Sequence, residues 1–541
     1  MKDDCEEYCG DDKLCRMMRT FFAAAVIATS LCIVVPSARA VDCASLHSLK
    51  LPDTTITMAQ RVTAGSVIVP PETPVEGLPA FCRVTGVIRP TTDSAIRFEV
   101  WMPESGWNER FLGVGNGGFA GVIGHGGLAS NLRRGFATAG TDTGHDGEAE
   151  DASWAYQHPE KIKDFGWRGV HLTTERAKQV VQAFYGRPAR RSYFDSCSDG
   201  GREALMEAQR FPEDYDGILA GAPANNWTGL FTSGIDVTQV TTGDPAGYIS
   251  SLKLPAITRA ALAACDAQDG VKDGFINNPA ACHFDPKTLL CKDGDSLDCL
   301  TAPQVRSLEK FYHGGTNSCG ESLMTGYAMG DEWPGWKDWV TGHGPGGASG
   351  LNYVQNFFRY MVYNDPKWSA LTANVDNAAR LAKEKAGREV DAINPDLSGF
   401  AARGGRLILY HGWNDQAISP WNAITYYESV RKQMGAEKAE GFVRLYMVPG
   451  MEHCAGGPGP NAFGQLGLPE AKGPGSGILH VLEDWVESNV PAKEIVAAKF
   501  QGEGKAATVK MTRPLCPYPQ VVTYKGTGST DDAANFVCRK E

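Results

Sequence analysis

Residues 196–201 read Ser-Cys-Ser-Asp-Gly-Gly, and this short stretch decides the predicted fold. Strand-like Tyr193-Phe194 precedes it, and a helical pattern from Arg202 to Phe211 follows it. A serine between small residues at a strand-to-helix turn is typical of a nucleophile elbow, where the tight turn pushes the hydroxyl outward. Ser196 stands where that motif usually has its first glycine. Ser198 is therefore a candidate nucleophile, although an ordinary loop serine could have the same neighbours.

The segments on both sides of this turn alternate between strand-like and helix-like patterns. Helical spacing covers 173–185 and 478–486, and short apolar runs indicate strands at 95–101, 111–114, 136–139, 218–220, 407–410 and 443–448. Such alternation predicts a parallel sheet with helices on both faces. Residues 227–403 break the rhythm and are rich in Gly, Pro, Asp and aromatic residues. We therefore predict an α/β fold in which one catalytic domain, 41–226 and 404–541, is interrupted by an inserted lid domain, 227–403.

The order of three residues along the chain supports the nucleophile hypothesis. Asp415 follows the predicted strand 407–410, and His453 follows the predicted strand 443–448. Hydrolases with an elbow serine carry the acid and then the histidine after later strands. Serine needs a base to take its proton, imidazole titrates near neutral pH, and a carboxylate can orient the imidazole. Alone, Asp415 could be a turn former and His453 a surface histidine, but the ordered set predicts nucleophile, acid and base.

Two further features surround these residues. The Gly-rich turn Gly115-Asn-Gly-Gly118 follows the predicted strand 111–114, and it could bring a second backbone N–H to a developing oxyanion or be a plain tight turn. Cys197 precedes Ser198, and Cys454 follows His453. A disulfide between these cysteines would clamp the nucleophile and base loops together. The alternative is two unpaired buried thiols.

Composition and charge exclude several classes of function. The 541 residues carry 52 Lys and Arg against 63 Asp and Glu, a net charge of −11, with 42% hydrophobic and 21% charged residues. This much apolar surface excludes a disordered chain. The acidic balance argues against nucleic-acid partners and against stable membrane association, because both would need a basic face.

The N-terminus indicates export. Arg16 and Arg19 precede an apolar run over 21–35, and Ala38-Arg39-Ala40 fits a cleavage site. We predict an N-terminal extension and signal peptide over 1–40, cleavage near Ala40, and a secreted or periplasmic enzyme. Export makes disulfides plausible for the cysteines of the mature chain. Zinc is the alternative, but the sequence has no CxxC or HxxxH pair to support it.

The motifs Cys197-Ser198-x-Gly200-Gly201, His411-Gly412-x-x-Asp415 and His453-Cys454 resemble those of the tannase and feruloyl esterase family, which includes mono(2-hydroxyethyl) terephthalate hydrolase. The resemblance runs from about Cys43 to Cys538 and implies an α/β-hydrolase fold with an inserted lid. It also implies that the N–H groups of Gly118 and Asp199 form the oxyanion hole. Five disulfides are implied as well: Cys43–Cys82, Cys197–Cys454, Cys265–Cys282, Cys291–Cys299 and Cys516–Cys538.

A turn-rich acidic loop is a candidate calcium site. Asp266, Asp269 and Asp273 lie close together in sequence, and hard oxygen ligands suit Ca²⁺, although the spacing is not that of an EF-hand. A solvated acidic turn is the alternative. The family resemblance implies a structural Ca²⁺ held by these three carboxylates and by the backbone carbonyls of Val271 and Phe275. No organic cofactor is expected.

Taken together, these features predict a secreted serine esterase that hydrolyses aromatic carboxylic esters. Within the family that the sequence resembles, feruloyl and related hydroxycinnamoyl esters are the first expectation, with galloyl esters and then terephthalate monoesters as alternatives. The substrate would be a small or polysaccharide-linked aromatic ester, and one or two lid aromatics should face its ring. A secreted serine peptidase and an inactive binding protein are the alternatives from other classes, and the intact Ser, Asp and His argue against the second.

Overall fold

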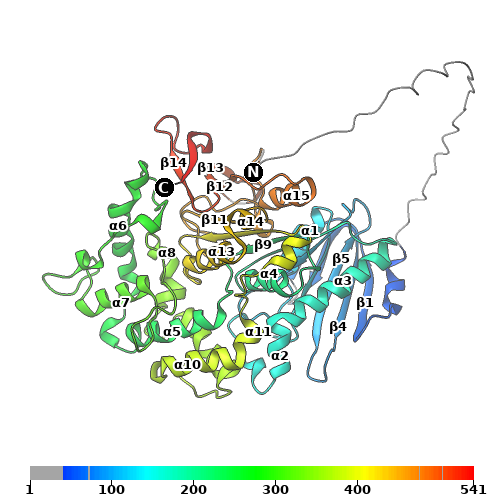
Figure 1. Ribbon diagram of the computed structural model, residues 1–541, viewed down its shortest axis with the longest axis horizontal. Helices are drawn as coiled ribbons and strands as arrows, with labels where there is room; N and C mark the ends of the chain where they lie inside the picture. Colours follow the sequence, from blue (N-terminus) through cyan, green and yellow to red (C-terminus); the bar gives the residue numbers. More distant parts are fainter. Residues whose placement is uncertain (1–40, 71–72, 474, 503, 541) are drawn as a thin grey trace, which may run out of the picture. The chain divides into compact units, whose positions relative to one another are not determined.

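The computed structural model describes residues 41–70, 73–473, 475–502 and 504–540, and Ala40–Glu541 forms one compact unit (Figure 1). The predicted signal peptide and extension, 1–40, lie outside the described residues. Within the described part of the chain, no helix combines the length and the apolar character that a membrane span requires.

A nine-stranded mixed sheet forms the centre of the fold. Its spatial order is β1, β4, β5, β7, β6, β8, β9, β10, β11. Neighbouring strands are antiparallel from β1 through β5 to β7, and parallel from β7 onward to β11. The parallel part contains the predicted strands except 95–101, which is β5 and runs antiparallel to both of its neighbours, and the antiparallel strands β1 and β4 extend the sheet beyond it. The bounds are β1 (Thr54–Val62), β4 (Phe81–Ile88), β5 (Ile96–Pro103), β6 (Arg110–Val114), β7 (Ala137–Thr141), β8 (Arg191–Cys197), β9 (Gly217–Gly221), β10 (Arg406–Gly412) and β11 (Val443–Val448).

Helices cover both faces of this sheet, as the alternating pattern predicted. Side chains on a strand point alternately to opposite faces, so Leu407 and Leu409 of β10 join one core while Ile408 and Tyr410 join the other. The first core is covered by α3 (Gly169–Tyr185), α4 (Asp199–Arg210) and α13 (Pro420–Met434). The second is covered by α1 (His125–Arg133) and α15 (Ile478–Ser488). The carboxyl ends of the parallel strands therefore meet at one edge of a rigid, doubly covered sheet.

The segment between β9 and β10 is helical, and Figure 1 shows most of its helices grouped to one side of the sheet. Two apolar clusters hold it together: one includes Trp227, Phe231 and Phe357, and the other includes Leu254 and Leu308. Its helices lie within the range predicted as the lid, 227–403, and we call the segment the lid below. Its helices are α5 (Trp227–Thr241), α6 (Leu254–Cys265), α7 (Ala302–His313), α8 (Glu332–Trp336), α9 (Ser349–Asn356), α10 (Val375–Ala382), α11 (Arg388–Val390) and α12 (Ser398–Ala402).

The remaining elements are peripheral. They are the helices α2 (Pro159–Lys163) and α14 (Ala436–Glu440), and the strand pairs β2 (Gly65–Val69) with β3 (Thr73–Leu78), β12 (Ile495–Gln501) with β13 (Thr508–Leu515), and β14 (Gln520–Tyr524) with β15 (Phe536–Lys540). Disulfides Cys43–Cys82 and Cys516–Cys538 fasten the two ends of the described chain, and Cys265–Cys282 and Cys291–Cys299 close loops in the lid. These are pairs that the resemblance implied, and Cys319 is a free, exposed thiol.

Candidate active site

Ser198 is the single residue between β8 and α4, and its backbone is strained. Its φ of 68° and ψ of −124° lie in a region that non-glycine residues rarely occupy. Such a turn can form only where neighbouring segments approach closely. A Cβ on Gly200 would collide with the Ser196 side chain, and a Cβ on Gly201 would collide with the Gly221 carbonyl. The two glycines after the serine are therefore required by packing, and α4 begins at Asp199, three residues earlier than its pattern suggested.

His453 lies between Ser198 and Asp415, with a hydrogen bond to each. Its Nε2 is 2.8 Å from Ser198 Oγ, and its Nδ1 is 2.8 Å from Asp415 Oδ2. Asp415 follows β10 and His453 follows β11, so the two adjacent parallel strands deliver both loops to the same edge. The main-chain N–H of Asn414 donates to Met451 O at 2.9 Å, which joins the two loops directly.

The Asp415 carboxylate is buried and fully engaged. Its Oδ1 accepts hydrogen bonds from the N–H groups of Ala417 and Ile418, each at 2.8 Å. Its Oδ2 faces His453 and also His411 Nε2, at 3.1 Å. Burial by itself would raise the pKa of Asp415, but the two histidines outweigh it and hold this pKa well below its usual range. The carboxylate is therefore ionised throughout the neutral range and can hold the His453 ring in one orientation. His411 belongs to the quoted HGxxD motif, but the sequence did not suggest that it shares this oxygen.

The Cys197–Cys454 disulfide adjoins this triad on both sides. The bond joins the residue before Ser198 to the residue after His453, with Cα atoms 6.0 Å apart. The alternative of two unpaired thiols at these positions does not hold in the structure.

Two backbone N–H groups beside Ser198 have no partner in the described part of the chain. Asp199 is the first residue of α4, so its N–H has no acceptor within the helix, and the N–H of Gly118 likewise donates to no described group. Gly118 has a φ of 60°, and a Cβ there would lie 2.7 Å from Tyr353 Oη. Both groups line the hollow that contains Ser198. Free N–H donors in this arrangement can stabilise an oxyanion.

The Gly-rich turn is held in place by Asn116 and by the buried Glu203 of α4. The Asn116 carbonyl accepts from Gly200 N–H at 2.9 Å, and its own N–H donates to Glu203 Oε2 at 2.9 Å. Burial, with Asp199 adding to it, raises the pKa of Glu203 well above its usual value. The turn that carries Gly118 and the elbow that carries Asp199 are thus one hydrogen-bonded unit.

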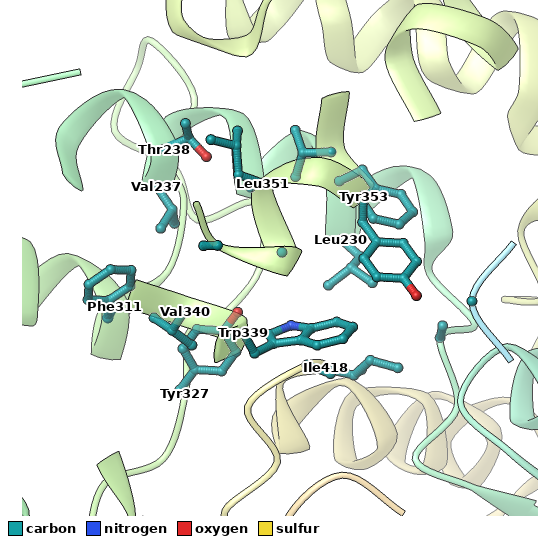
Figure 2. A pocket seen from close by; sticks show the side chains of 18 of the residues that line it. Leu230, Val237, Thr238, Phe311, Tyr327, Trp339, Val340, Leu351, Tyr353 and Ile418 are labelled. Atoms are coloured by element: carbon teal, nitrogen blue, oxygen red, sulfur yellow. The ribbon is translucent and has the colours of Figure 1, made fainter. Parts of the chain in front are cut away.

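A cavity beginning at Ser198 runs into the lid, and we call it the lid cavity. Figure 2 places Trp339, Leu230 and Tyr353 toward one end and Val237, Thr238 and Phe311 toward the other. The expected lid aromatics at the site are thus Trp339 and Tyr353, whereas Trp333 is exposed. The lining also includes Gly118, Asp199, Ala224, Trp227, Phe231, Gly234, Thr241, Thr242, Tyr327, Val340, Ala348, Gly350, Leu351, Val354, Ala417 and Ile418.

A second cavity adjoins the first at Gly118, Ser198, Trp339 and Tyr353. It extends between the Gly-rich turn and the loop that carries His453 and Cys454. Ser198 therefore lies at the junction of two hollows. An ester needs this arrangement, because its acyl and alcohol parts leave the reacting carbon in different directions.

The predicted calcium loop lies between Cys265 and Cys282, and its Phe275 ring approaches Gly450. Asp266 accepts from the N–H groups of Asp273 and Gly274, and Arg513 is 2.6 Å from Asp273 Oδ2. Burial, opposed in part by Arg513, raises the pKa of Asp273 to about 6. Three carboxylates close together suit a cation in their chemistry. The ion pair with Arg513, however, already neutralises Asp273, which is one of the proposed ligands.

The carboxylates of Asp266, Asp269 and Asp273 do not converge on one point. A metal ion needs several ligand atoms close together. Among the described residues, such a group is formed by His171, Glu207 and Asp214, whose possible ligand atoms all lie within 4.8 Å of one another. There, His171 Nδ1 is already 2.7 Å from Asp214 Oδ2, a direct hydrogen bond. Calcium binding by the loop, with the carbonyls of Val271 and Phe275 as further ligands, stays a prediction.

The comparisons with known proteins match nearly the whole chain. Residues 82–539 match the family described as tannase and feruloyl esterase. An uncharacterized esterase of Xanthomonas campestris pv. campestris is 42% identical, over 96% of this chain and 94% of its own. A probable feruloyl esterase B-2 of Neosartorya fischeri is 34% identical, over 92% of this chain and 95% of its own.

Solved structures agree with these matches. The crystal structure of feruloyl esterase B from Aspergillus oryzae superimposes with a TM-score of 0.85 at 30% identity, covering 92% of this chain and 99% of that one. Tannin acyl hydrolase from Aspergillus niger superimposes with a TM-score of 0.72 at 23% identity, covering 91% and 93%, and this likeness concerns the fold. The predicted α/β-hydrolase fold is confirmed.

Proposed function

Because the chain belongs to the tannase and feruloyl esterase family and is a carboxylic ester hydrolase, we propose that it is a serine esterase that releases hydroxycinnamic acids such as ferulic acid from their esters. The observation that carries this proposal is His453, which bridges Ser198 Oγ and Asp415 Oδ2 with two 2.8 Å hydrogen bonds beside the free N–H groups of Gly118 and Asp199.

The reaction would proceed through an acyl-enzyme. Ser198 Oγ attacks the ester carbonyl carbon while His453 Nε2 takes the hydroxyl proton, and the carbonyl oxygen becomes an oxyanion held by Gly118 and Asp199 N–H. Collapse of this intermediate breaks the bond to the alcohol oxygen, which takes the proton from His453. Water then attacks the acyl carbon while His453 Nε2 takes a proton from it. Collapse of the second intermediate breaks the bond to Ser198 Oγ, which takes that proton from His453, and the acid is released. Asp415 keeps the imidazole oriented and stabilises its charged form.

The lid cavity favours a neutral, largely apolar acyl group. The residues that line it include no Lys, Arg or His, and the only acidic one, Asp199, has its carboxylate paired with Arg202 at 2.6 Å. A terephthalate monoester would bury a carboxylate there without a cation, which is costly. A galloyl ring would bring three hydroxyls to walls dominated by residues such as Val237, Val340 and Leu351. A hydroxycinnamoyl group presents an apolar body with few oxygens and fits these walls better.

Export is part of the same proposal. The five disulfides of the structure support an oxidising compartment, because disulfides of this kind are rare in reducing cytosol. N-terminal sequencing of the protein recovered from culture medium and periplasm would locate the cleavage site, for which a new N-terminus at Val41 is expected. Recovery of an uncleaved protein in the cytoplasm would contradict this part.

The test of the function is a substrate panel for the mature chain and for Ser198→Ala. The panel contains methyl ferulate, methyl gallate, mono(2-hydroxyethyl) terephthalate and a chromogenic peptide. We expect the highest kcat/KM for methyl ferulate, and a loss of at least about 10³-fold in Ser198→Ala. A fluorophosphonate probe should label the wild type and not the variant. Preferred hydrolysis of the peptide, or ester turnover that survives in the variant, would refute the proposal.

A further inference from the structure

The lid cavity is longer than one aromatic acid requires. Its wall follows one face of α5, from Trp227 beside the Ser198 end, through Leu230, Gly234 and Thr238, to Thr241. These positions recur at intervals of three and four, so they share one side of the helix. From Trp227 to Thr241, an α-helix advances by roughly 21 Å at about 1.5 Å per residue.

A hydroxycinnamoyl group spans less than half of this length. It consists of a propenoyl chain and one ring, so with its carbonyl at Ser198 the ring would lie among Leu230, Trp339 and Tyr353. Figure 2 shows Val237, Thr238 and Phe311 well beyond those residues, toward the opposite end of the cavity. The part near Thr238 and Thr241 is therefore left over when a single-ring acid is bound.

The lining of this leftover part has a definite chemistry. Val237, Phe311 and Val340 provide apolar walls. The hydroxyls of Thr238 and Tyr327 make no hydrogen bond to any group in the described part of the chain, so they are free to bind an oxygen of a ligand. Among the described residues, none with a charged side chain lines this part. An uncharged, mainly apolar group that carries an oxygen atom matches these walls.

We propose that Val237, Thr238, Thr241, Phe311 and Tyr327 form a distal acyl subsite that accepts an apolar substituent linked through an ether to the para position of the ring. This inference rests on the proposed function, and it extends the substrate class from simple hydroxycinnamates to their 4-O-substituted derivatives. The substituent would fill space that a simple ferulate leaves to water, and an oxygen atom farther along it would accept a hydrogen bond from Thr238.

A homologous series of methyl 4-alkoxycinnamates, from ethoxy to octyloxy, measures the subsite. Each methylene that enters an apolar cavity should lower KM by about two- to fourfold. We expect KM to fall with chain length until the chain reaches the end of the cavity, and kcat/KM to drop beyond that length. A loss of more than about 100-fold in kcat/KM at the first ethoxy or propoxy member, with methyl 4-hydroxycinnamate still hydrolysed, would overturn the proposal.

Two variants that place a large side chain in the cavity locate the subsite along α5. In Thr238→Phe, kcat/KM should drop at a shorter alkoxy chain than in Thr242→Phe, because the two positions lie about 6 Å apart along the helix. Thr238→Val keeps the shape of the side chain, so it should tolerate the same chain lengths as the wild type. The readout is the ratio of kcat/KM for long and short esters within each variant, which cancels differences in the folded fraction. The same cut-off length in both Phe variants would overturn the proposal.

A binding experiment separates this proposal from the proposed function. Calorimetric titration of Ser198→Ala with 4-alkoxycinnamic acids needs no turnover. Affinity that rises with chain length and is blocked by adding Thr238→Phe supports the distal subsite. Affinity that does not depend on chain length refutes it, whether or not the wild type hydrolyses cinnamate esters. Failure of the wild type on all the cinnamate esters would instead refute the proposed function.

Discussion

Cys197 and Cys454 join the residue before Ser198 to the residue after His453 through one disulfide. Their Cα atoms are 6.0 Å apart although 257 positions separate them in sequence. The sheet already brings β8 and β11 to one edge, but loops that follow strands are the mobile parts of such folds. The disulfide therefore adds a covalent link between the two loops that carry Ser198 and His453.

Removing this disulfide should impair catalysis as well as stability. We expect Cys197→Ala/Cys454→Ala to lose about 2–5 kcal/mol of stability. We expect its kcat to fall by at least about tenfold, since a shift near 1 Å at a catalytic hydrogen bond is expensive. The matched control is Cys516→Ala/Cys538→Ala, which should lower Tm but leave kcat of the folded enzyme nearly unchanged. Equal effects of the two pairs on kcat would contradict a special role for Cys197–Cys454.

Gly118 and Gly117 make a matched pair of glycines for testing the oxyanion hole. A Cβ at Gly118 would collide with Ala149 O at a φ of 60°, whereas a Cβ at Gly117 meets nothing within 4 Å. Displacement of the Gly118 N–H removes a donor from the transition state, so we expect Gly118→Ala to lose about 10²-fold in kcat. Steady-state kinetics should show Gly117→Ala within a few-fold of the wild type. A loss of only a few-fold in the kcat of Gly118→Ala would argue that this N–H is not an oxyanion donor.

Asp331 should make the enzyme less stable as the pH rises. Burial, with the negative charges of Glu452 and Glu332 adding to it and Lys499 opposing it, raises the pKa of Asp331 to about 9. Between about pH 4 and 9 the folded state keeps a proton that the unfolded state releases, so stability falls as the pH rises through this window. Asp331→Asn removes this loss, and its Tm relative to the wild type should increase between pH 4 and pH 9.

The Tm of Asp331→Asn should exceed that of the wild type by about 1–3 °C at pH 8 and should equal it near pH 4. Thermal unfolding followed by circular dichroism at a series of pH values measures it. Asp338→Asn is the control on the same lid segment, because that carboxylate is exposed and should change Tm little. A Tm difference for Asp331→Asn that is constant with pH would show that this carboxyl does not titrate in the expected window.

Calcium should stabilise the lid without taking part in the reaction. If Asp266, Asp269 and Asp273 bind Ca²⁺, addition of 1 mM CaCl₂ to chelator-treated enzyme should raise Tm, because a ligand that binds only the folded state stabilises it. Asp269→Asn should abolish this rise, and kcat at 25 °C should change less than about twofold. The control is Asp293→Asn, which alters another acidic residue of the lid outside the loop. A Tm that does not respond to Ca²⁺ would favour the alternative of a solvated acidic turn.

Several parts of this protein could be predicted from the sequence because they depend on local patterns. The elbow at Ser198 needs small neighbours, the strands need short apolar runs, and each catalytic candidate follows such a run in the expected order. Each of these patterns can be recognised in a short stretch of consecutive residues. They therefore predicted the α/β fold and identified Ser198, Asp415 and His453 as candidates. The antiparallel strands β1 and β4 were not predicted, although β4 alternates buried and half-buried residues as strands do.

The rest was decided by tertiary packing. Tyr353 of the lid faces Gly118, and Asp331 lies beside Glu452, yet neither contact has a sequence pattern. Each depends on how a segment of the lid or a loop packs against a distant strand end, and many sequences satisfy such packing equally well. The residue types therefore determined the chemistry that the site can perform. The length and polarity of the lid cavity, and with them the acids that it can bind, arose only when the helices of the insertion packed over Ser198.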